Sequence, residues 1–334
     1  MIFVMIFFMK FFTNRADTDI IKIFGQKTMD LGEAADALRE GTEHKMDINV
    51  FYQTLDDLFT NNELTRVEPY LTASLSQAKE DEDWQAYIAV CNEMIGFYRS
   101  ISQHEKAYQA SEDVLLLMEE LQMEDTEHFA TVLLNSATAY RAGGRYRDAY
   151  EQYMRAAGIY EGLIAPDDYR FAGLYNNMSM LLEATGENGQ AAELAEKALD
   201  IIRKQADARM EEATTLTNLA LIKFKLSRTE EAEKLLTEAV SIFEEAGEKT
   251  DAHYSGALAG LAEAAFRKAD YARALELYDR ACEEVAKHFG ENESYAILSE
   301  NCAAVCEQLG EPERRQAYLL RAERVRSALI RSMD

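Results

Sequence analysis

A segment of about 42 residues is repeated six times along this chain, and this repeat constrains the fold more than any other feature. The copies align on one anchor position, and successive anchors are 42, 42, 41, 42 and 41 residues apart. The anchors are Glu93, Asn135, Asn177, Asn218, Gly260 and Asn301. A period of this length is typical of architectures in which one small unit stacks on the next. The sequence therefore predicts a stack of similar units.

Small side chains recur at fixed distances from the anchor. Alanine or serine lies two residues after it in five copies, and alanine lies fourteen and twenty-one residues after it in five copies each. Nine residues after the anchor come Gly144, Gly186, Ser227, Ala269 and Gly310. Small residues at fixed points on two successive helices let the helix axes approach closely. Each copy is therefore predicted to be a helix–turn–helix hairpin that buries its apolar face only against its neighbours.

The composition agrees with an all-α chain. Only 3 prolines and 16 glycines occur among 334 residues, and 48% of the residues are apolar. Turn-forming residues are too few for a sandwich or a barrel, whereas long helices joined by short turns need few of them. The fold class predicted from the sequence is an α-solenoid.

The small–turn–Ala–Ala frame resembles the tetratricopeptide repeat, and the period near 42 residues is similar to the longer, kinesin-light-chain-type variant. The segment 289–296 is similar to the loop that ends such long repeats. The resemblance covers roughly residues 84–330. It implies a right-handed superhelix of about seven hairpins, in which the first helix of each hairpin lines a concave groove. The family is defined by packing residues, so the resemblance implies a fold more specifically than a ligand.

Three segments are expected along the chain. Residues 1–46 are an N-terminal extension whose first twelve residues are almost wholly apolar but too short to span a bilayer, which takes about 20. This start is interpreted as an export or anchoring segment, as an extension upstream of the true start and outside the native fold, or as a loosely packed helix. Residues 47–82 are predicted to form a degenerate capping hairpin without the alanine frame. Residues 83–334 are predicted to form the solenoid, with an arginine-rich last helix as its cap.

Charge and cysteine content limit the partners. The chain has 60 Asp and Glu against 35 Lys and Arg, which gives a net charge of −25. Such a chain is repelled by nucleic acid and by anionic lipid, so neither is an expected partner. Four cysteines are few for this length and suggest no disulfide framework, which favours the reducing cytoplasm.

Signatures of catalysis do not occur in the sequence. There is no glycine-rich phosphate loop, no HExxH motif and no nucleophile elbow. Cys302 and Cys306 are four residues apart, but both fall at packing positions of the repeat and are predicted to be core residues. Acidic pairs such as Glu211 and Glu212 are expected on solvated faces. We therefore predict a protein that is not an enzyme and that carries no metal and no cofactor.

The resemblance implies that the anchor side chains point into the groove, where Asn135, Asn177, Asn218 and Asn301 would form a ladder. Residues just before an anchor, or three and seven residues after it, are predicted to share this wall. They are Thr138, Asn176, Met180, Thr217, Leu221, Lys225 and Arg267. An amide both donates and accepts hydrogen bonds, so the ladder suits a ligand with free backbone groups. In the alternative interpretation the amides bond the neighbouring helix and set the pitch of the superhelix.

The function expected from these features is a non-catalytic scaffold whose groove binds an extended peptide or a partner helix. The alternative is a peptide-sensing regulatory receptor of the same repeat type. Its output would act through another protein, because residues 1–46 are too short for a DNA-binding domain and hold no basic recognition helix. Pairing of two copies through a terminal hairpin would give a homodimer. Lys225, Arg267 and the terminal arginines are the places where an acidic partner could dock. In the alternative interpretation Lys225 and Arg267 are solvated or form salt bridges between repeats, and the terminal arginines solvate the outer face of the last repeat.

Overall fold

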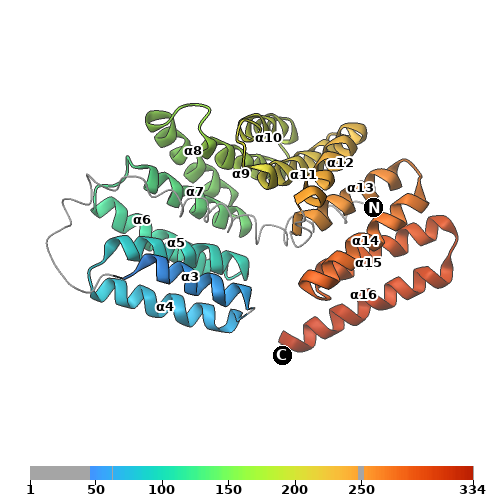
Figure 1. Cartoon of the computed structure of the whole chain (residues 1–334), viewed down its shortest axis with the longest axis horizontal. Helices are drawn as coiled ribbons and strands as arrows, with labels where there is room; N and C mark the ends of the chain where they lie inside the picture. The colour runs from blue at the N-terminus through green and yellow to red at the C-terminus, as the bar shows by residue number, and fades with distance from the viewer. Residues whose placement is uncertain (1–45, 62, 247–251, 334) are drawn as a thin grey trace. The chain divides into compact units, whose positions relative to one another are not determined.

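The computed structural model describes residues 46–61, 63–246 and 252–333, and within these ranges every regular element is a helix (Figure 1). The apolar start of the chain lies outside the described residues. No helix in the described ranges is both long enough and apolar enough to cross a membrane. The all-α prediction is confirmed. The helices belong to two compact units, divided between Pro166 and Asp167, and each unit is described by itself.

The N-terminal unit consists of three hairpins. They are formed by α3 (Ile48–Thr60) with α4 (Leu64–Glu80), α5 (Trp84–Ser100) with α6 (His104–Glu120), and α7 (Glu127–Ala142) with α8 (Tyr146–Leu163). Each hairpin packs on the next, since α4 contacts α5 and α6 contacts α7. Phe129 and Tyr153 are fully buried between the helices and fill the core of α7 and α8. Hairpins stacked in this way form an α-solenoid.

The C-terminal unit consists of four hairpins built on the same plan. They are formed by α9 (Tyr169–Thr185) with α10 (Asn188–Ile202), α11 (Arg209–Lys225) with α12 (Thr229–Ala246), α13 (Ala252–Arg267) with α14 (Tyr271–Phe289), and α15 (Glu293–Leu309) with α16 (Pro312–Met333). One continuous apolar core runs from α10 to α16. Its members include the small residues of the repeat, so the frame seen in the sequence is the set of positions where neighbouring helices touch.

The alanines of the repeat frame are buried. The residues fourteen and twenty-one after the anchors are at most 2% exposed, whether they are alanine or, in the first copy, Val114. The exception is Arg315 of the last copy, whose side chain is 41% exposed. The anchor of the fifth copy is Gly260, where four other copies have asparagine, and the packing explains this departure. A Cβ atom added there would lie 2.8 Å from Cδ1 of Leu236, so glycine lets α12 pack against the backbone of α13.

The turn between the two helices of a hairpin uses the same backbone conformation in all six copies. The residue nine after each anchor has a positive φ, between 59° and 93°. These residues are Ser102, Gly144, Gly186, Ser227, Ala269 and Gly310. A left-handed residue is a common way to end a helix, and glycine adopts it without the strain that a Cβ atom causes. Three copies therefore carry this turn on a residue that is not glycine.

Replacing Ala269 with glycine is expected to stabilise the C-terminal unit by about 1 kcal/mol, because it removes the clash of a Cβ atom in the left-handed region. Ala184 is a matched control, since it is an exposed residue inside α9. The same substitution there is expected to destabilise the unit by about 0.5–1 kcal/mol. Urea denaturation followed by circular dichroism measures both. If both substitutions changed the free energy of unfolding in the same direction, the left-handed conformation of Ala269 would be contradicted.

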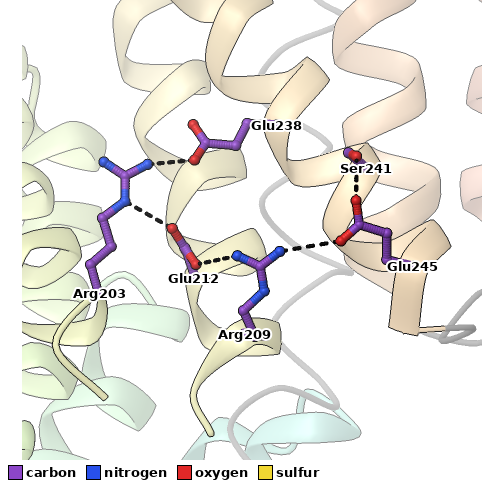
Figure 2. A network of polar contacts seen from close by, with 6 residues as sticks. All are labelled: Arg203, Arg209, Glu212, Glu238, Ser241 and Glu245. Atoms are coloured by element: carbon purple, nitrogen blue, oxygen red, sulfur yellow. Dashed lines mark hydrogen bonds and ion pairs between the residues drawn. The ribbon is translucent and has the colours of Figure 1, made fainter. Parts of the chain in front are cut away.

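A polar network connects three helices at one edge of the C-terminal unit (Figure 2). Glu212 of α11 accepts hydrogen bonds from Arg203 Nε at 2.8 Å and from Arg209 Nη1 at 3.3 Å. Arg203 also binds Glu238 and Arg209 also binds Glu245, both on α12. The expectation that Glu212 lies on a solvated face is wrong, because its side chain is buried between these two guanidinium groups. The network ties the end of α10 to α11 and α12.

Candidate binding face

The first helix of each hairpin is called here the A helix, and the anchors lie on α5, α7, α9, α11, α13 and α15. Neighbouring A helices touch directly, as α5 and α7 do in the N-terminal unit and α9, α11 and α13 do in the C-terminal unit. The A-helix face of a unit is defined by its anchors and by the positions one residue before and three and seven residues after them. The residues predicted to bind a ligand belong to this face. The structure divides them into asparagines, side chains that pack the hairpins, and cations that are already paired within the chain.

Asn135 is already engaged within the N-terminal unit. Its Nδ2 donates a 2.8 Å hydrogen bond to Oδ1 of Asn92, which joins α7 to α5. Asn92 lies one residue before the anchor of the preceding copy. At this position the amide links neighbouring A helices, which is the alternative interpretation that the sequence leaves open.

The same two positions in the C-terminal unit are occupied by Asn176 and Asn218, but no such bond connects them. Asn218 instead directs Nδ2 at Sδ of Met180 over 4.0 Å, and a thioether is a weak acceptor. Oδ1 of Asn176 is buried and accepts no hydrogen bond. An unpartnered buried polar atom costs about 1–3 kcal/mol, so this side chain has an unsatisfied acceptor on the A-helix face.

Two further anchors of the C-terminal unit are buried amides. Asn177 lies on α9 and Asn301 on α15, where it is only 5% exposed. Nδ2 of Asn301 is a buried donor without an acceptor. Asn176 and Asn301 together therefore offer one acceptor and one donor that the fold leaves unpaired.

The threonines of the predicted set do not face a ligand. Thr138 is buried, and its hydroxyl lies 2.9 Å from the carbonyl oxygen of Leu134 and 3.0 Å from the hydroxyl of Tyr153 on α8. Thr217 is buried and donates to the carbonyl oxygen of Ala213 at 2.8 Å. Leu221 is half-buried against the apolar core. These side chains pack the hairpins, and the hydroxyl groups have their partners.

The two cations of the predicted set are paired inside the C-terminal unit. Lys225 forms an ion pair with Glu183 of α9, whose side chain is only 2% exposed. Burial lowers the pKa of Lys225. Arg267 binds Glu263 at 2.6 Å, and its guanidinium lies 5.0 Å from the ring centre of Phe224. Both charges are neutralised by this chain, which weakens the expectation that they bind an acidic partner.

Several arginines of α16 are paired as well. Arg324 binds Glu291 at 2.7 Å, while Arg326 binds Glu293 at 3.0 Å and also Glu300. Arg314 binds Glu311 at 2.6 Å. These three arginines therefore neutralise acidic residues of the last hairpin and of the loop before it.

In the sequence Glu93 is only a departure from the amide ladder, yet in the structure it is a buried acid. Glu93 of α5 is 6% exposed, and its Oε1 has no hydrogen-bond partner. Burial, and then the charge of Asp56 on α3, raise the pKa of Glu93 to about 8. Burial and the charge of Glu93 in turn raise the pKa of Tyr52. The signal available in the sequence was the acid at a position where most copies have an amide.

Residues 170–245, which cover most of α9 to α12, match the family described as tetratricopeptide repeat. This part of the chain consists of tetratricopeptide repeats. No curated protein matches the chain. The described residues contain no group of three or more His, Cys, Asp or Glu side chains that could hold a metal ion.

Solved structures agree with the repeat assignment. The chain is similar to BtubC (BKLC) from P. vanneervenii, with 22% identity, a TM-score of 0.58, and coverage of 68% of this chain and 92% of that chain. It is also similar to a tetratricopeptide repeat protein from Parabacteroides merdae, with 17% identity, a TM-score of 0.51, and coverage of 83% and 92%. The apo form of RapI gives 13% identity, a TM-score of 0.59, and coverage of 83% and 76%. At these identities the likeness supports the α-solenoid fold.

Proposed function

We propose that the chain is a non-catalytic scaffold and that the A-helix face of its C-terminal unit binds an extended segment or a helix of a partner protein. A tetratricopeptide fold supports a role in protein–protein interaction in general. To this general role we add a binding face for the ligand and the side-chain atoms that would contact it. Stacked repeats present a long row of side chains from successive helices, which suits a ligand that is itself long.

The observation that carries the proposal is the pair of unsatisfied amide atoms. Oδ1 of Asn176 is an acceptor without a donor, and Nδ2 of Asn301 is a donor without an acceptor. A peptide backbone supplies both complementary groups in every residue except proline. Asn176 is half-buried as a residue, and in the proposed complex its side chain would turn Oδ1 toward the ligand. Binding would then regain hydrogen bonds that folding leaves unmade.

The charges of this face support the same ligand class. Lys225 and Arg267 are paired with Glu183 and Glu263, so the face has little net charge at these positions. Met180 and Leu221 are half-buried and add apolar surface. A face of amides, apolar side chains and neutralised charges favours backbone recognition over recognition of a charged side chain.

The test replaces Asn176 and Asn301 by alanine and measures the affinity for peptides selected on the intact chain from a random twelve-residue library. We expect each substitution to weaken binding by about tenfold, which is the value of one well-formed hydrogen bond in a buried site. Stability should be unchanged or higher, because each substitution removes a buried polar group without a partner.

Asn135 provides the matched control, because its amide is already bonded to Asn92. Asn135→Ala is expected to lower the free energy of unfolding of the N-terminal unit by about 1 kcal/mol while leaving the peptide affinity unchanged. Equal affinity of the wild type, Asn176→Ala and Asn301→Ala for every selected peptide would refute the proposed site.

A further inference from the structure

Arg141 of α7 is a buried cation to which the described residues give no counter-charge. The residue is 7% exposed, and neither Nε nor Nη2 of its guanidinium group has a hydrogen-bond partner. Lys223 of α11 is buried to a similar degree, but its Nζ binds Glu196 at 2.7 Å and Glu231 at 3.2 Å. An arginine side chain is not deprotonated in proteins, so burial cannot neutralise it. Arg141 therefore keeps a charge that requires an anion.

The two unpartnered nitrogens of Arg141 form one edge of the guanidinium group, and this chain shows what such an edge binds. In Arg170 of α9, Nε donates to Oδ1 of Asp168 and Nη2 donates to Oδ2, each at 2.8 Å. Two parallel hydrogen bonds of this kind are the strong form of an arginine–carboxylate pair. The corresponding edge of Arg141 is unoccupied. Its geometry is that of a site for one carboxylate.

The helix end that carries Arg141 is next to an exposed turn. Arg141 is the last residue but one of α7, and residues 143–145, which follow the helix, are exposed. A Cβ atom added to Gly144 would have no other atom within 4 Å, so there is open space at this turn. A ligand can approach the end of α7 from this side.

We propose that Arg141 binds the carboxylate of an aspartate or glutamate side chain of the partner protein through Nε and Nη2. This inference rests on the proposed scaffold function and names the chemistry of a second contact, in the N-terminal unit. In the complex the Arg141 side chain would turn its free edge toward the ligand beside the exposed turn. The carboxylate would then supply both acceptors and the negative charge that the guanidinium group lacks in the free chain.

A single carboxylate suits this place better than a phosphate group does. The next basic residues along the chain are already paired, Arg145 with Asp148 at 2.5 Å and Arg147 with Glu151 at 2.9 Å. One guanidinium edge matches the two oxygens and the single charge of a carboxylate, whereas a phosphate group carries up to two charges. The net charge of −25 repels an acidic partner at long range, but physiological salt screens this repulsion beyond about 8 Å and screens a buried pair much less.

The experiment uses the intact chain and a random library of twelve-residue peptides with amidated C-termini, so that only side chains supply carboxylates. Peptides that bind the wild type are sequenced, synthesised and measured by fluorescence anisotropy in physiological salt. We expect them to share an aspartate or glutamate at one position. Replacement of that residue by asparagine or glutamine, and Arg141→Met in the protein, should each weaken binding by about tenfold or more. Both changes together should weaken it little more than either one, because they remove the same contact.

Arg147→Met is the matched control, because the Arg147 side chain is 90% exposed on α8 of the same unit and its loss changes the net charge by the same amount. We expect less than a twofold change in affinity for this variant, since exposed charges act weakly in salt. Urea denaturation followed by Trp84 fluorescence adds a second measurement. Arg141→Met removes a buried charge without a partner, so its midpoint should lie at a higher urea concentration than that of the wild type. An arginine that served only to hold the fold together would give a lower midpoint when replaced.

The outcomes separate this inference from the proposed function. Peptides without a shared acidic residue, equal affinity for the wild type and Arg141→Met, or a lower urea midpoint for Arg141→Met would overturn the carboxylate site. If the peptides still depend on Asn176 and Asn301, the proposed function stands alone. Peptides that depend on Arg141 but not on these two amides would support the carboxylate site and reject the proposed face of the C-terminal unit. A library that yields no bound peptide counts against both.

Discussion

Replacing Lys225 with alanine is expected to lower the free energy of unfolding of the C-terminal unit by about 3–5 kcal/mol. Lys225 of α11 is the ion-pair partner of Glu183 on α9, and the Glu183 side chain is only 2% exposed. Apart from this ion pair, neither carboxylate oxygen of Glu183 has a hydrogen bond. Removal of the lysine would leave a buried charge without compensation, which is the costly way to break a buried pair.

Circular dichroism during urea denaturation measures the loss. Trp84, the only tryptophan of the chain, lies on α5, so its fluorescence reports the unfolding of the N-terminal unit. The stability measured in this way should be the same in the variant and in the wild type. Arg267→Ala is the matched control, because Arg267 and Glu263 are 33% and 26% exposed and their pair is expected to contribute at most about 1 kcal/mol. Combining Lys225→Ala with Glu183→Gln should recover most of the loss. If Lys225→Ala lowered the free energy of unfolding no more than Arg267→Ala does, the buried ion pair between Lys225 and Glu183 would be contradicted.

The N-terminal unit is expected to lose stability as the pH rises from about 5 to about 8. The pKa of Glu93 is raised from 4.5 to about 8 in the folded chain, chiefly by burial and then by the charge of Asp56. Between these two values the unfolded chain releases the proton of this carboxyl group while the folded chain retains it. The unfolded state therefore binds fewer protons, and a rise in pH favours unfolding by up to about 1.4 kcal/mol per pH unit.

Glu93→Gln cannot release a proton and is expected to remove this part of the pH dependence. The variant should be more stable than the wild type at pH 8 and nearly equal to it at pH 5. Trp84 fluorescence during urea denaturation follows the transition, because Trp84 and Glu93 share α5. The remaining pH dependence is common to both proteins. Identical pH profiles for the two proteins would show that Glu93 is not a buried acid.

Much of the fold could be predicted from the sequence because its signals are local and repeated. Ala191 and Ala198 are fully buried where α10 meets its neighbours, and Gly186 has the left-handed backbone that a turn after α9 requires. Each of these roles depends on residues within the same hairpin or the next one. The resemblance to tetratricopeptide repeats is confirmed for the same reason. The division between Pro166 and Asp167 was not predicted, because the repeat period continues through it without change.

The candidate site could be predicted only in part. The register of the anchors is right, but the partner of each amide depends on the residue that the neighbouring A helix brings to it. Asn135 meets Asn92, whereas Asn218 meets Met180 and leaves Asn176 without a donor. For Lys225 the sequence left both an acidic ligand and a salt bridge between repeats open, because Glu183, 42 residues earlier, gave no sign of its burial. Burial of a single charged residue depends on the stacking of hairpins, and a repeat pattern does not specify it.

The most direct test of the scaffold proposal is a titration of the chain, labelled with ¹⁵N at asparagine, with a selected peptide. The side-chain amide resonances of Asn176 and Asn301 report the formation of hydrogen bonds to the ligand. We predict that both resonances shift to saturation with the peptide, while the resonance of Asn135 stays in place because its amide remains bonded to Asn92. Saturation of the protein with peptide while the Asn176 and Asn301 resonances do not move would contradict the proposal.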